Sequence, residues 1–502
     1  MSIFPKLFFN FFTAVKSVYV PPAWLTAFIA RVTADGGTLY DQGHTVQTYN
    51  NTSPYSPTVI QPCDTGKPTV LYNIVPDSPP ADFTVSRIDD KYVLGSGGTL
   101  VSYAIDDPAI EFNPDGTYKG LPVETAATNS ALQSEDLDNG TYWLTANSSI
   151  AANTQTDPKG GTNSFLLAEV ANIGVHSFLI NGPYRPTINI NEYWTQSVYL
   201  KKGTGASAPD IVQLTFGTST HLSTQYANFN ISTGTVLTTS GGTADIRDMG
   251  NGWYRCSWTA QANQTGIQGG IVGFAFTNNN DSLGRAPSYL GQASADVFIW
   301  GAQLEQSHTA TSYIPTTTGV VNRVKDEIEL AGASSLIGQS EGTLYVEVDW
   351  KTVSGTIQYL LDVTDGTTGN RVLIYNFNGI LRMYARATGT GDLFNQGVPS
   401  TAFTGVQRFA FAYKTNDFEL YRNGSSVSTN TSGSLATLVL NQINIGSDYI
   451  GAYQPNMWIR SVALYNTRLS AADMEALTKG DGYFVGVNED VFGTSNVTFS
   501  ER

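Results

Sequence analysis

Three acidic side chains lie close together in the stretch GLPVETAATNSALQSEDLDNGTYW, residues 120–143: Glu124, Glu135 and Asp136. Two carboxyl groups about 5 to 9.5 Å apart, facing one sugar, can hydrolyse a glycosidic bond. Glu135 and Asp136 are adjacent, so in an extended chain they point to opposite faces, and Glu124 lies eleven residues upstream of Glu135. The spacing therefore argues against a shared cleft. It favours a structural role for Glu124, with Trp143 as a core anchor.

Tyrosine and arginine side chains at two places could bind a sugar without reacting with it. Aromatic rings stack on the C–H faces of a sugar, and planar polar groups bond its hydroxyls. Tyr184 and Arg185 lie in the proline-bounded loop NGPYRPT, where burial of the ring is less forced. Four further candidates lie on expected strands, two positions apart in pairs: Tyr375, Arg382, Tyr384 and Arg386. The alternative for each residue is a place in the core or framework.

The composition predicts an all-β protein with more than one domain. The chain has 502 residues, which exceeds what one hydrophobic core usually supports. Hydrophobic residues make up 41% of it and charged residues only 14%, which indicates a globular protein with large cores. The 49 glycines and many Ser, Thr and Asn residues, set among β-branched and aromatic positions, favour short strands joined by tight turns.

Charge and motif content exclude several classes of protein. A formal net charge of −15 opposes binding to nucleic acid and insertion into an anionic membrane surface. Cys63 and Cys256 lie far apart in the sequence and are expected to be free thiols. The sequence has no zinc-ligand spacing, no phosphate-binding loop, no Gly-x-Ser-x-Gly elbow and no His-Glu-x-x-His motif.

The first part of the chain is predicted to be a helical and extended arm. The apolar run LFFNFFTAV, residues 7–15, is too short to span a bilayer, and we expect it to bury its phenylalanines against a partner protein. The stretch AWLTAFIARVTADGG, residues 23–37, has apolar residues at helical spacing and two glycines that can end a helix. Residues 42–82 are rich in Pro, Thr, Ser and Asn, which predicts an extended connector.

Two blocks of short strands must position the candidate residues. From Phe83 onward, runs such as YWTQSVYLKKG, WYRCSWTA and ADVFIWGAQLE are separated by turn residues, and GTLYVEVDW and RVLIYNF belong to a second block that starts near Gly342. Repeated short strands without intervening helices predict β-sandwiches. Ser470 should cap one closing helix, residues 471–477. Five tryptophans of the first block should lie in its core: Trp143, Trp194, Trp253, Trp258 and Trp300.

The first block resembles a module of bacteriophage virion proteins. The run FTVSRIDDKYVLGSGGTLVSYAIDDPAIEFNPDGTYKGLPVETAATNSALQSEDL is similar to the lead-in of a carbohydrate-binding-module-like sandwich in these proteins. YWTQSVYLKKG and GNGWYRCSW match internal strands of the module, and ADVFIWGAQLEQSHTATSYIPTTTGVVNR resembles its end. The resemblance covers about residues 83–330. It implies that the lead-in docks onto the sandwich and that Glu124 meets backbone N–H groups or an arginine.

The second block resembles the laminin G and concanavalin A-like lectin superfamily. The resemblance is carried by DFELYRNGSSVS, by INIGSDYIGAYQPNMWIRSVALYNTRLSAADMEAL and by the turn DGTTGN before RVLIYNF. These runs match strands, an Asn-Gly hairpin and the closing helix of that jelly roll. Several laminin G-like domains bind calcium at a loop rim, so Asp362 and Asp365 could ligate calcium here. An Asx turn before a hairpin is the favoured alternative.

The concanavalin A-like fold also includes hydrolases, which keeps a glycan-degrading enzyme as an alternative. Those hydrolases usually carry paired Glu residues on one strand, as in Glu-x-Asp-x-x-Glu. The run GTLYVEVDW places Glu347 and Asp349 on one strand face, but no third carboxylate follows in register. We therefore expect no catalytic residues.

These observations predict an all-β, non-enzymatic phage virion protein that displays two jelly-roll-type β-sandwiches. Residues 1–82 should dock on other virion proteins, residues 83–330 and 331–480 should form the sandwiches, and residues 481–502 a C-terminal tail. The sandwiches would bind host cell-surface glycan, and the protein is expected at the virion surface as a homo-oligomer, with a trimer favoured. The other alternative is a purely structural decoration or fibre protein.

Overall fold

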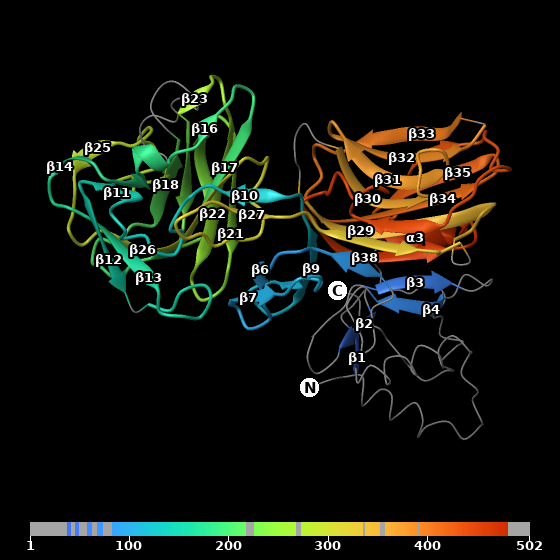
Figure 1. Ribbon diagram of the computed structural model, residues 1–502, viewed down its shortest axis with the longest axis horizontal. Coiled ribbons are helices and arrows are strands. Elements are labelled where there is room, and N and C mark those ends of the chain that lie inside the picture. The colour runs from blue at the N-terminus through green and yellow to red at the C-terminus, as the bar shows by residue number, and fades with distance from the viewer. Residues whose placement is uncertain are drawn as a thin grey trace.

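The computed structural model describes residues 38–41, 46–49, 58–62, 68–73 and 83–479, apart from residues 154, 217–224, 268–272, 335–336, 352–356 and 390. Within these residues the protein is nearly all β, as the composition predicts, and it forms two sandwiches that lie side by side (Figure 1). No helix in this part of the chain is long and apolar enough to cross a membrane. The helix predicted over residues 23–37, Cys63 and the tail at residues 481–502 lie outside the described residues.

The first sandwich consists of two six-stranded antiparallel sheets. One sheet has, in spatial order, the strands β11 (Trp143–Ala146), β15 (Ser177–Ile180), β24 (Gly273–Phe276), β18 (Ile211–Thr215), β19 (Tyr226–Asn230) and β20 (Thr235–Ser240). The other has β12 (Ser148–Asn153), β13 (Ser164–Glu169), β26 (Asp296–Glu305), β17 (Tyr193–Lys202), β22 (Tyr254–Gln261) and β21 (Thr243–Asp248). Short pairs and a 3-10 turn complete it: β14 (Ile173–Val175) with β25 (Ser288–Leu290), β16 (Thr187–Ile188) with β23 (Gly266–Ile267), and η1 (Gly182–Tyr184).

Tryptophans dominate the interior of the first sandwich. All five that the sequence assigns to the core are buried, with at most 5% of their surface exposed. Trp143 stacks on Phe178, with ring centroids 5.0 Å apart, and its indole N–H donates to the backbone of Gln133. Cys256 is a free thiol buried among them. The predicted roles of Trp143 as a core anchor and of Cys256 as an unpaired cysteine are confirmed.

The second sandwich packs a seven-stranded sheet on a nine-stranded sheet. The seven-stranded sheet has, in order, β33 (Gly391–Pro399), β32 (Ile380–Ala387), β31 (Arg371–Phe377), β30 (Ile357–Thr364), β37 (Gln442–Ile445), β28 (Glu327–Ala331) and β5 (Thr84–Ser86). The nine-stranded sheet has β36 (Ser425–Asn430), β35 (Asp417–Arg422), β34 (Gly405–Lys414), β29 (Glu341–Trp350), β38 (Met457–Tyr465), β3 (Thr58–Pro62) and β4 (Pro68–Asn73), with β9 (Tyr118–Val123) on β38 and β8 (Glu111–Phe112) on β9.

The closing helix of the second sandwich agrees with the prediction from the sequence, whereas the expected connector differs from it. Helix α3 (Ala471–Lys479) begins at the predicted cap, where the Ser470 hydroxyl accepts the backbone N–H of Asp473 at 3.2 Å. Its Met474 and Leu477 pack on the outer side of the nine-stranded sheet. By contrast, strand β3 pairs in parallel with β38, so part of the expected connector over residues 42–82 is incorporated into this sheet. Strand β2 (Val46–Tyr49) of that region pairs with β1 (Thr38–Asp41), which lies just before it.

The first sandwich is inserted into the second. Strands β5 and β9, from the run taken as the lead-in of the first module, pair with β28 and β38 of the second sandwich. The chain then crosses to the first sandwich through β10 (Ala127–Asn129) and returns through β27 (Val321–Arg323), and these two crossing strands pair with each other. The hairpin β6 (Lys91–Leu94) and β7 (Leu100–Tyr103) packs on the first sandwich, against Trp253 and Trp300, and Ala131 and Leu137 near the end of the run lie in the core of that sandwich. The range 83–330 expected for the first sandwich therefore includes strands, β5 and β9, that belong to the sheets of the second sandwich.

Candidate functional site

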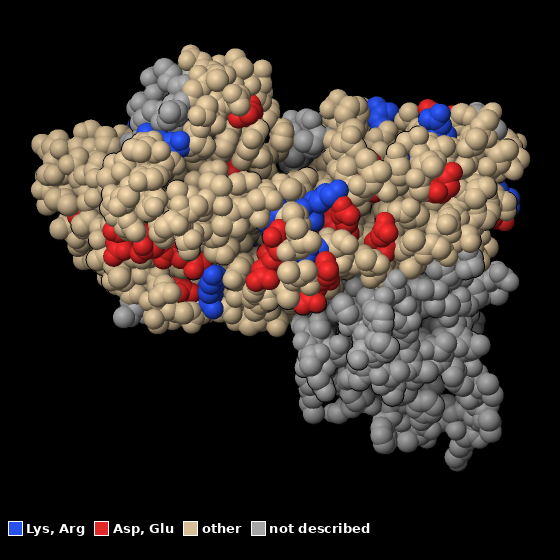
Figure 2. Space-filling view, in the orientation of Figure 1, with Lys and Arg blue, Asp and Glu red and all other residues tan. Residues whose placement is uncertain are grey.

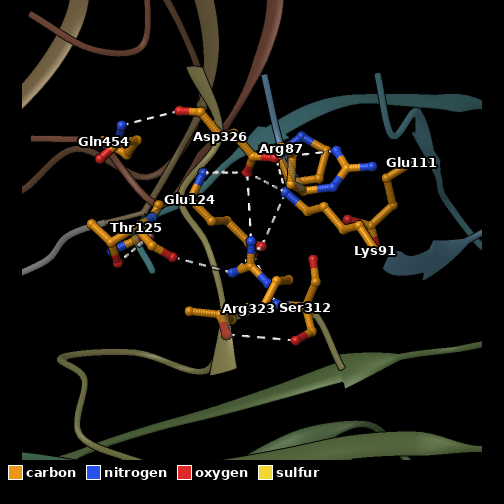
Figure 3. A network of polar contacts seen from close by, with 12 residues as sticks. Arg87, Lys91, Glu111, Glu124, Thr125, Ser312, Arg323, Asp326 and Gln454 are labelled. Atoms are coloured by element: carbon orange, nitrogen blue, oxygen red, sulfur yellow. Dashed lines mark hydrogen bonds and ion pairs between the residues drawn. The ribbon is translucent and has the colours of Figure 1, made fainter. Parts of the chain in front are cut away.

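Charged side chains of both signs gather where the two sandwiches meet, and a second, mainly acidic group lies on the lower part of the first sandwich in the same view (Figure 2). Beneath this surface a buried ion-pair network, here called the junction network, joins both crossing points of the chain (Figure 3). It consists of three cations and two carboxylates, all less than 10% exposed: Arg87, Lys91, Arg323, Glu124 and Asp326.

The distances in the junction network are those of close ion pairs. Lys91 Nζ lies 2.6 Å from the Asp326 carboxylate and 3.1 Å from that of Glu124. Arg323 Nη2 lies 3.1 Å from Glu124, and Arg87 Nη1 lies 3.3 Å from Asp326. Each carboxylate also accepts a backbone N–H, from Ser312 at Glu124 and from Glu124 itself at Asp326. The interpretation of Glu124 as a structural acid that meets backbone N–H groups or an arginine is confirmed.

The electrostatics of the junction network favour ionised carboxylates. Burial by itself raises the pKa of Glu124, but Lys91, Arg323 and the Ser312 hydrogen bond outweigh it and lower that pKa to about 2. A carboxyl group that is held ionised at neutral pH has no proton to donate, so Glu124 cannot act as a general acid there. The network joins the crossing segments of the two sandwiches through close ion pairs.

The cavity beside the junction network is too small for a ligand of sugar size. Its volume is about 30 Å³, and its lining includes Glu111, Arg247 and Trp458. Such a space holds about two water molecules, whereas ligand pockets usually measure about 300 Å³ or more. Glu111 is itself occupied, because it pairs with Arg247 and accepts the indole N–H of Trp458.

The remaining acids of the opening stretch do not converge. Glu135 pairs with Lys159 at 2.6 Å, and Asp136 is exposed and accepts a hydrogen bond from the side chain of Asn139. Neither shares a cleft with Glu124, as their spacing predicts.

The acids on β29 share a strand face, as predicted, but both are committed to cations. Glu347 is buried, and its two oxygens lie 2.7 Å from Arg460 Nε and 3.0 Å from Arg408 Nε. Although burial raises the pKa of Glu347, the two arginines outweigh it and hold that pKa below the ordinary value. Asp349 pairs with Lys119 at 2.6 Å. Glu347 is thus held ionised and cannot act as a general acid near neutral pH.

The outer side of the seven-stranded sheet gathers the candidate sugar-binding residues of the second block. The inner side chains of β30 to β32, such as Leu361, Ile374 and Met383, fill the core. The alternate side chains therefore face outward. Together with the adjoining loop after β37 they form what we call the tyrosine face: Tyr359, Arg371, Tyr375, Arg382, Tyr384, Arg386, Tyr449 and Tyr453.

Tyrosine rings form a row across the tyrosine face. Tyr359 pairs across the strands with Tyr375, and the two rings lie 5.5 Å apart with 24° between their planes. Tyr453 lies 5.8 Å from Tyr359 on the other side and is 46% exposed. Burial raises the pKa of Tyr359 to about 12, so its phenol is neutral at physiological pH and can both donate and accept hydrogen bonds.

Arginines flank this row. Arg371 lies 5.4 Å from the ring centroids of both Tyr359 and Tyr449. Arg382 is paired across the strands with Tyr375, and its Nη1 donates to the side chain of Asn395 at 3.3 Å. Rings with guanidinium groups beside them provide stacking surface and hydrogen-bond donors within one patch.

The structure gives the two calcium candidates different partners. Asp362 is fully buried and forms an ion pair with Arg371, and burial raises its pKa to about 6 although Arg371 opposes the shift. Asp365 forms the alternative Asx turn, since its carboxylate accepts the backbone N–H of Thr367 at 2.9 Å and the amide of Asn370 at 2.7 Å. Nowhere in the described chain do three or more His, Cys, Asp or Glu side chains gather as a metal site would require.

The loop candidates of the first sandwich lie apart from the tyrosine face. Tyr184 ends η1, and its ring packs on that of Tyr142 with centroids 4.4 Å apart, at the edge of the first core. Arg185 Nε donates to the backbone of Ile180 at 2.8 Å. These contacts match the framework alternative for this pair.

Four members of the tyrosine face have no counterpart among the residues expected from the sequence: Tyr359, Arg371, Tyr449 and Tyr453. Strict alternation would place Tyr359 on the same side as the core residue Leu361. A bulge between them shifts the register, so that Tyr359 faces outward with Tyr375. Arg371 could have been found, because it lies four residues before Tyr375 and therefore on the same face of one strand.

Comparisons with known proteins identify no family. No family model matches the sequence, and no curated protein is similar to it. Among solved structures, similarity is found to the Ruminococcus gnavus IT-sialidase CBM40, at 20% identity over 29% of this chain and 86% of that one, with a TM-score of 0.26.

Two further solved structures are similar to parts of this chain. One is described as "Crystal structure of the receptor binding domain" (12% identity, TM-score 0.26), and this chain covers only 40% of its length. The other is described as "Cell entry of botulinum neurotoxin type C is dependent upon interaction with two ganglioside molecules" (11% identity, 32% of this chain and 40% of that one, TM-score 0.27). At these values the function has to be argued from the residues of this chain.

Proposed function

We propose that the protein is a non-enzymatic bacteriophage virion protein whose second sandwich binds host-surface glycan through the tyrosine face. One observation carries the binding part: Tyr375, Tyr359 and Tyr453 form a row of rings on the outer side of a sheet whose core is filled by other residues. A surface row of aromatic rings is what stacking on sugar rings requires. The virion part rests on the motifs of residues 83–330, which resemble those of phage virion proteins.

The openness of the tyrosine face suits weak, repeated binding. A shallow sugar site typically has roughly millimolar affinity, about −4 kcal/mol. Many copies on one particle raise the effective affinity by about 10²- to 10⁴-fold through multivalency. In this proposal residues 1–82 attach the protein to other virion proteins, and a homotrimer places several tyrosine faces on one particle.

A glycan array probed with the full chain tests the proposal. The chain should be displayed at high valency on beads, and wild type should bind a subset of glycans. Tyr375→Ala should weaken binding about tenfold, because one stacking ring is lost. Tyr226→Ala is the matched control, since it removes a half-buried tyrosine from β19 of the first sandwich. The absence of binding by wild type at high valency would leave the purely structural alternative, a decoration or fibre protein.

A separate measurement tests the hydrolase alternative. Because Glu347 is held ionised by Arg408 and Arg460, wild type should release no reducing sugar from host polysaccharide. If wild type released reducing sugar, and Glu347→Gln lost this activity while it still folded and bound glycan, the hydrolase alternative would be supported.

A further inference from the structure

Arg382 differs from the other arginines of the tyrosine face in lacking an acidic partner. Arg371 pairs with Asp362, and Arg386 lies 3.9 Å from Asp392. Within the described chain, no carboxylate lies within ion-pair distance of Arg382. Its positive charge is therefore the one on this face that the protein itself leaves uncompensated.

The donors of Arg382 are also largely unused. Its Nε is buried from solvent without a hydrogen-bond partner, and the bond from Nη1 to Asn395, at 3.3 Å, is long. Because Nε is closed to solvent, a ligand would bond the terminal N–H groups of the guanidinium. An arginine with spare charge and spare donors in a row of sugar-stacking rings is suited to an anionic group.

The neighbouring strands keep space open around Arg382. On β31 its cross-strand partner is Tyr375, and on β33 it is Gly397. A Cβ at position 397 would lie only 3.0 Å from Cγ of Arg382 and 2.5 Å from the carbonyl oxygen of Leu381. Glycine thus leaves room for the aliphatic stem of Arg382 along the sheet, next to the Tyr375 ring.

We propose that Arg382 binds the carboxylate of an acidic sugar whose ring lies against Tyr375 and Tyr384. This inference rests on the proposed function and narrows its ligand to carboxylated pyranoses. The planar guanidinium presents parallel N–H groups that match the two oxygens of a carboxylate. The phenol of Tyr375 is placed to bond a hydroxyl of the same sugar. Tyr384 lies two residues after Arg382 on the same side of β32, and its oxygen can accept a hydrogen bond there while its own O–H donates to Asp392.

The net charge of −15 does not prevent this binding. Charges more than about 8 Å apart are largely screened at physiological ionic strength. The local contact with Arg382 therefore determines whether an anionic sugar binds. A sulfated sugar shares the negative charge but not the planar two-oxygen geometry. It therefore forms a separate arm of the experiment.

The experiment compares matched glycans on the full chain displayed at high valency. The probes are glucuronic-acid oligosaccharides with their carboxyl-reduced forms, 3′-sialyllactose with lactose, and 3′-sulfolactose. Wild type should bind at least one carboxylated probe about tenfold more tightly than its neutral partner, and added salt should reduce the difference. Arg382→Gln should lower the affinity for the carboxylated probe about tenfold more than the affinity for its neutral partner, and so abolish the preference. Lys414→Gln, which removes a charge from the opposite sheet, should keep the preference.

The outcomes separate this inference from the proposed function. Equal binding of charged and neutral probes, or a preference that persists in Arg382→Gln, would overturn the role of Arg382 and leave glycan binding intact. A preference for 3′-sulfolactose over both carboxylated probes would overturn the assignment of a carboxylate. If wild type bound no glycan in the set or on the array, both proposals would fall.

Discussion

The junction network and the tyrosine face both contain arginines, but the charges of these arginines have different surroundings. In the junction network every cation meets a carboxylate, and Lys91, Arg87 and Arg323 are each at most 1% exposed. On the tyrosine face the rings are half-buried or exposed, and Arg382 has no carboxylate partner among the described residues. Residue type therefore does not separate the scaffold from the proposed binding face. Burial and pairing distinguish the two, because a buried charge is retained only where a partner offsets its desolvation.

The largest expected effect comes from breaking the junction network. Asp326→Ala removes the carboxylate shared by Lys91, Arg87 and Arg323, and should lower the free energy of unfolding by about 3–5 kcal/mol, because buried cations are left unpaired. Urea unfolding measures this. The neighbouring Glu327→Ala breaks only a half-exposed pair with Lys325, and should cost about 1 kcal/mol or less. Equal effects of the two variants would contradict the comparison.

The next effect is a loss of stability in acid. The pKa of Glu124 is about 2 in the folded protein and near 4.5 when unfolded, so its contribution is fully present above about pH 4.5 and disappears as pH falls towards 2. The loss should be about 3 kcal/mol. Unfolding measured between pH 2.5 and 6 should therefore show a steeper acid slope for wild type than for Glu124→Gln. Parallel slopes would show that Glu124 is not held ionised by the network.

Substitution of a ring on the tyrosine face should lower stability less than the junction-network variants do, but it should weaken glycan binding more. Tyr359→Ala should reduce glycan affinity about tenfold, or about 1.4 kcal/mol, by interrupting the row of rings. The free energy of unfolding should fall by less than about 2 kcal/mol, because the ring is only half-buried. Titration of a bound glycan, together with urea unfolding, separates the two quantities. A variant that loses stability and keeps its affinity would assign Tyr359 to the framework.

The smallest expected effect on binding is that of Tyr184→Ala. Its ring packs on Tyr142 at the edge of the first core, away from the tyrosine face, so glycan affinity should change less than twofold, within about 0.4 kcal/mol. The same glycan titration measures it. A drop comparable to that of Tyr359→Ala would move the binding site, or a second site, to the first sandwich.

Much of the fold can be predicted from local sequence patterns. The strand runs, the five buried tryptophans and the Ser470 cap are each specified by residues within a few positions of one another. Spacing within one strand also predicts that Tyr384 and Arg382 share a face, and the structure places them so. What these patterns lack is the identity of each strand's partner.

One prediction, drawn from the resemblance, differs from the structure, and strict alternation would have misplaced one further residue. The run from Phe83 reads as the lead-in of the following sandwich, yet its strands β5 and β9 pair with strands that lie more than two hundred residues further along the chain. Tyr359 alternates with Leu361 as a core residue would, yet a bulge turns it outward. Both features depend on backbone pairing between distant segments, which residue types alone do not specify.

The sequence by itself determined an all-β chain, its tryptophan-rich core and the structural part played by Glu124, because burial, alternation and capping act over short distances. Only the tertiary structure decided that one sandwich is inserted in the other, and that Tyr359, Tyr375 and Tyr453 lie in one row. Strand pairing brings rings from β30, β31 and a later loop together, so that neighbouring ring centroids lie 5.5 to 5.8 Å apart. Only those contacts show which charges are paired with a carboxylate and which, like that of Arg382, have no carboxylate partner among the described residues.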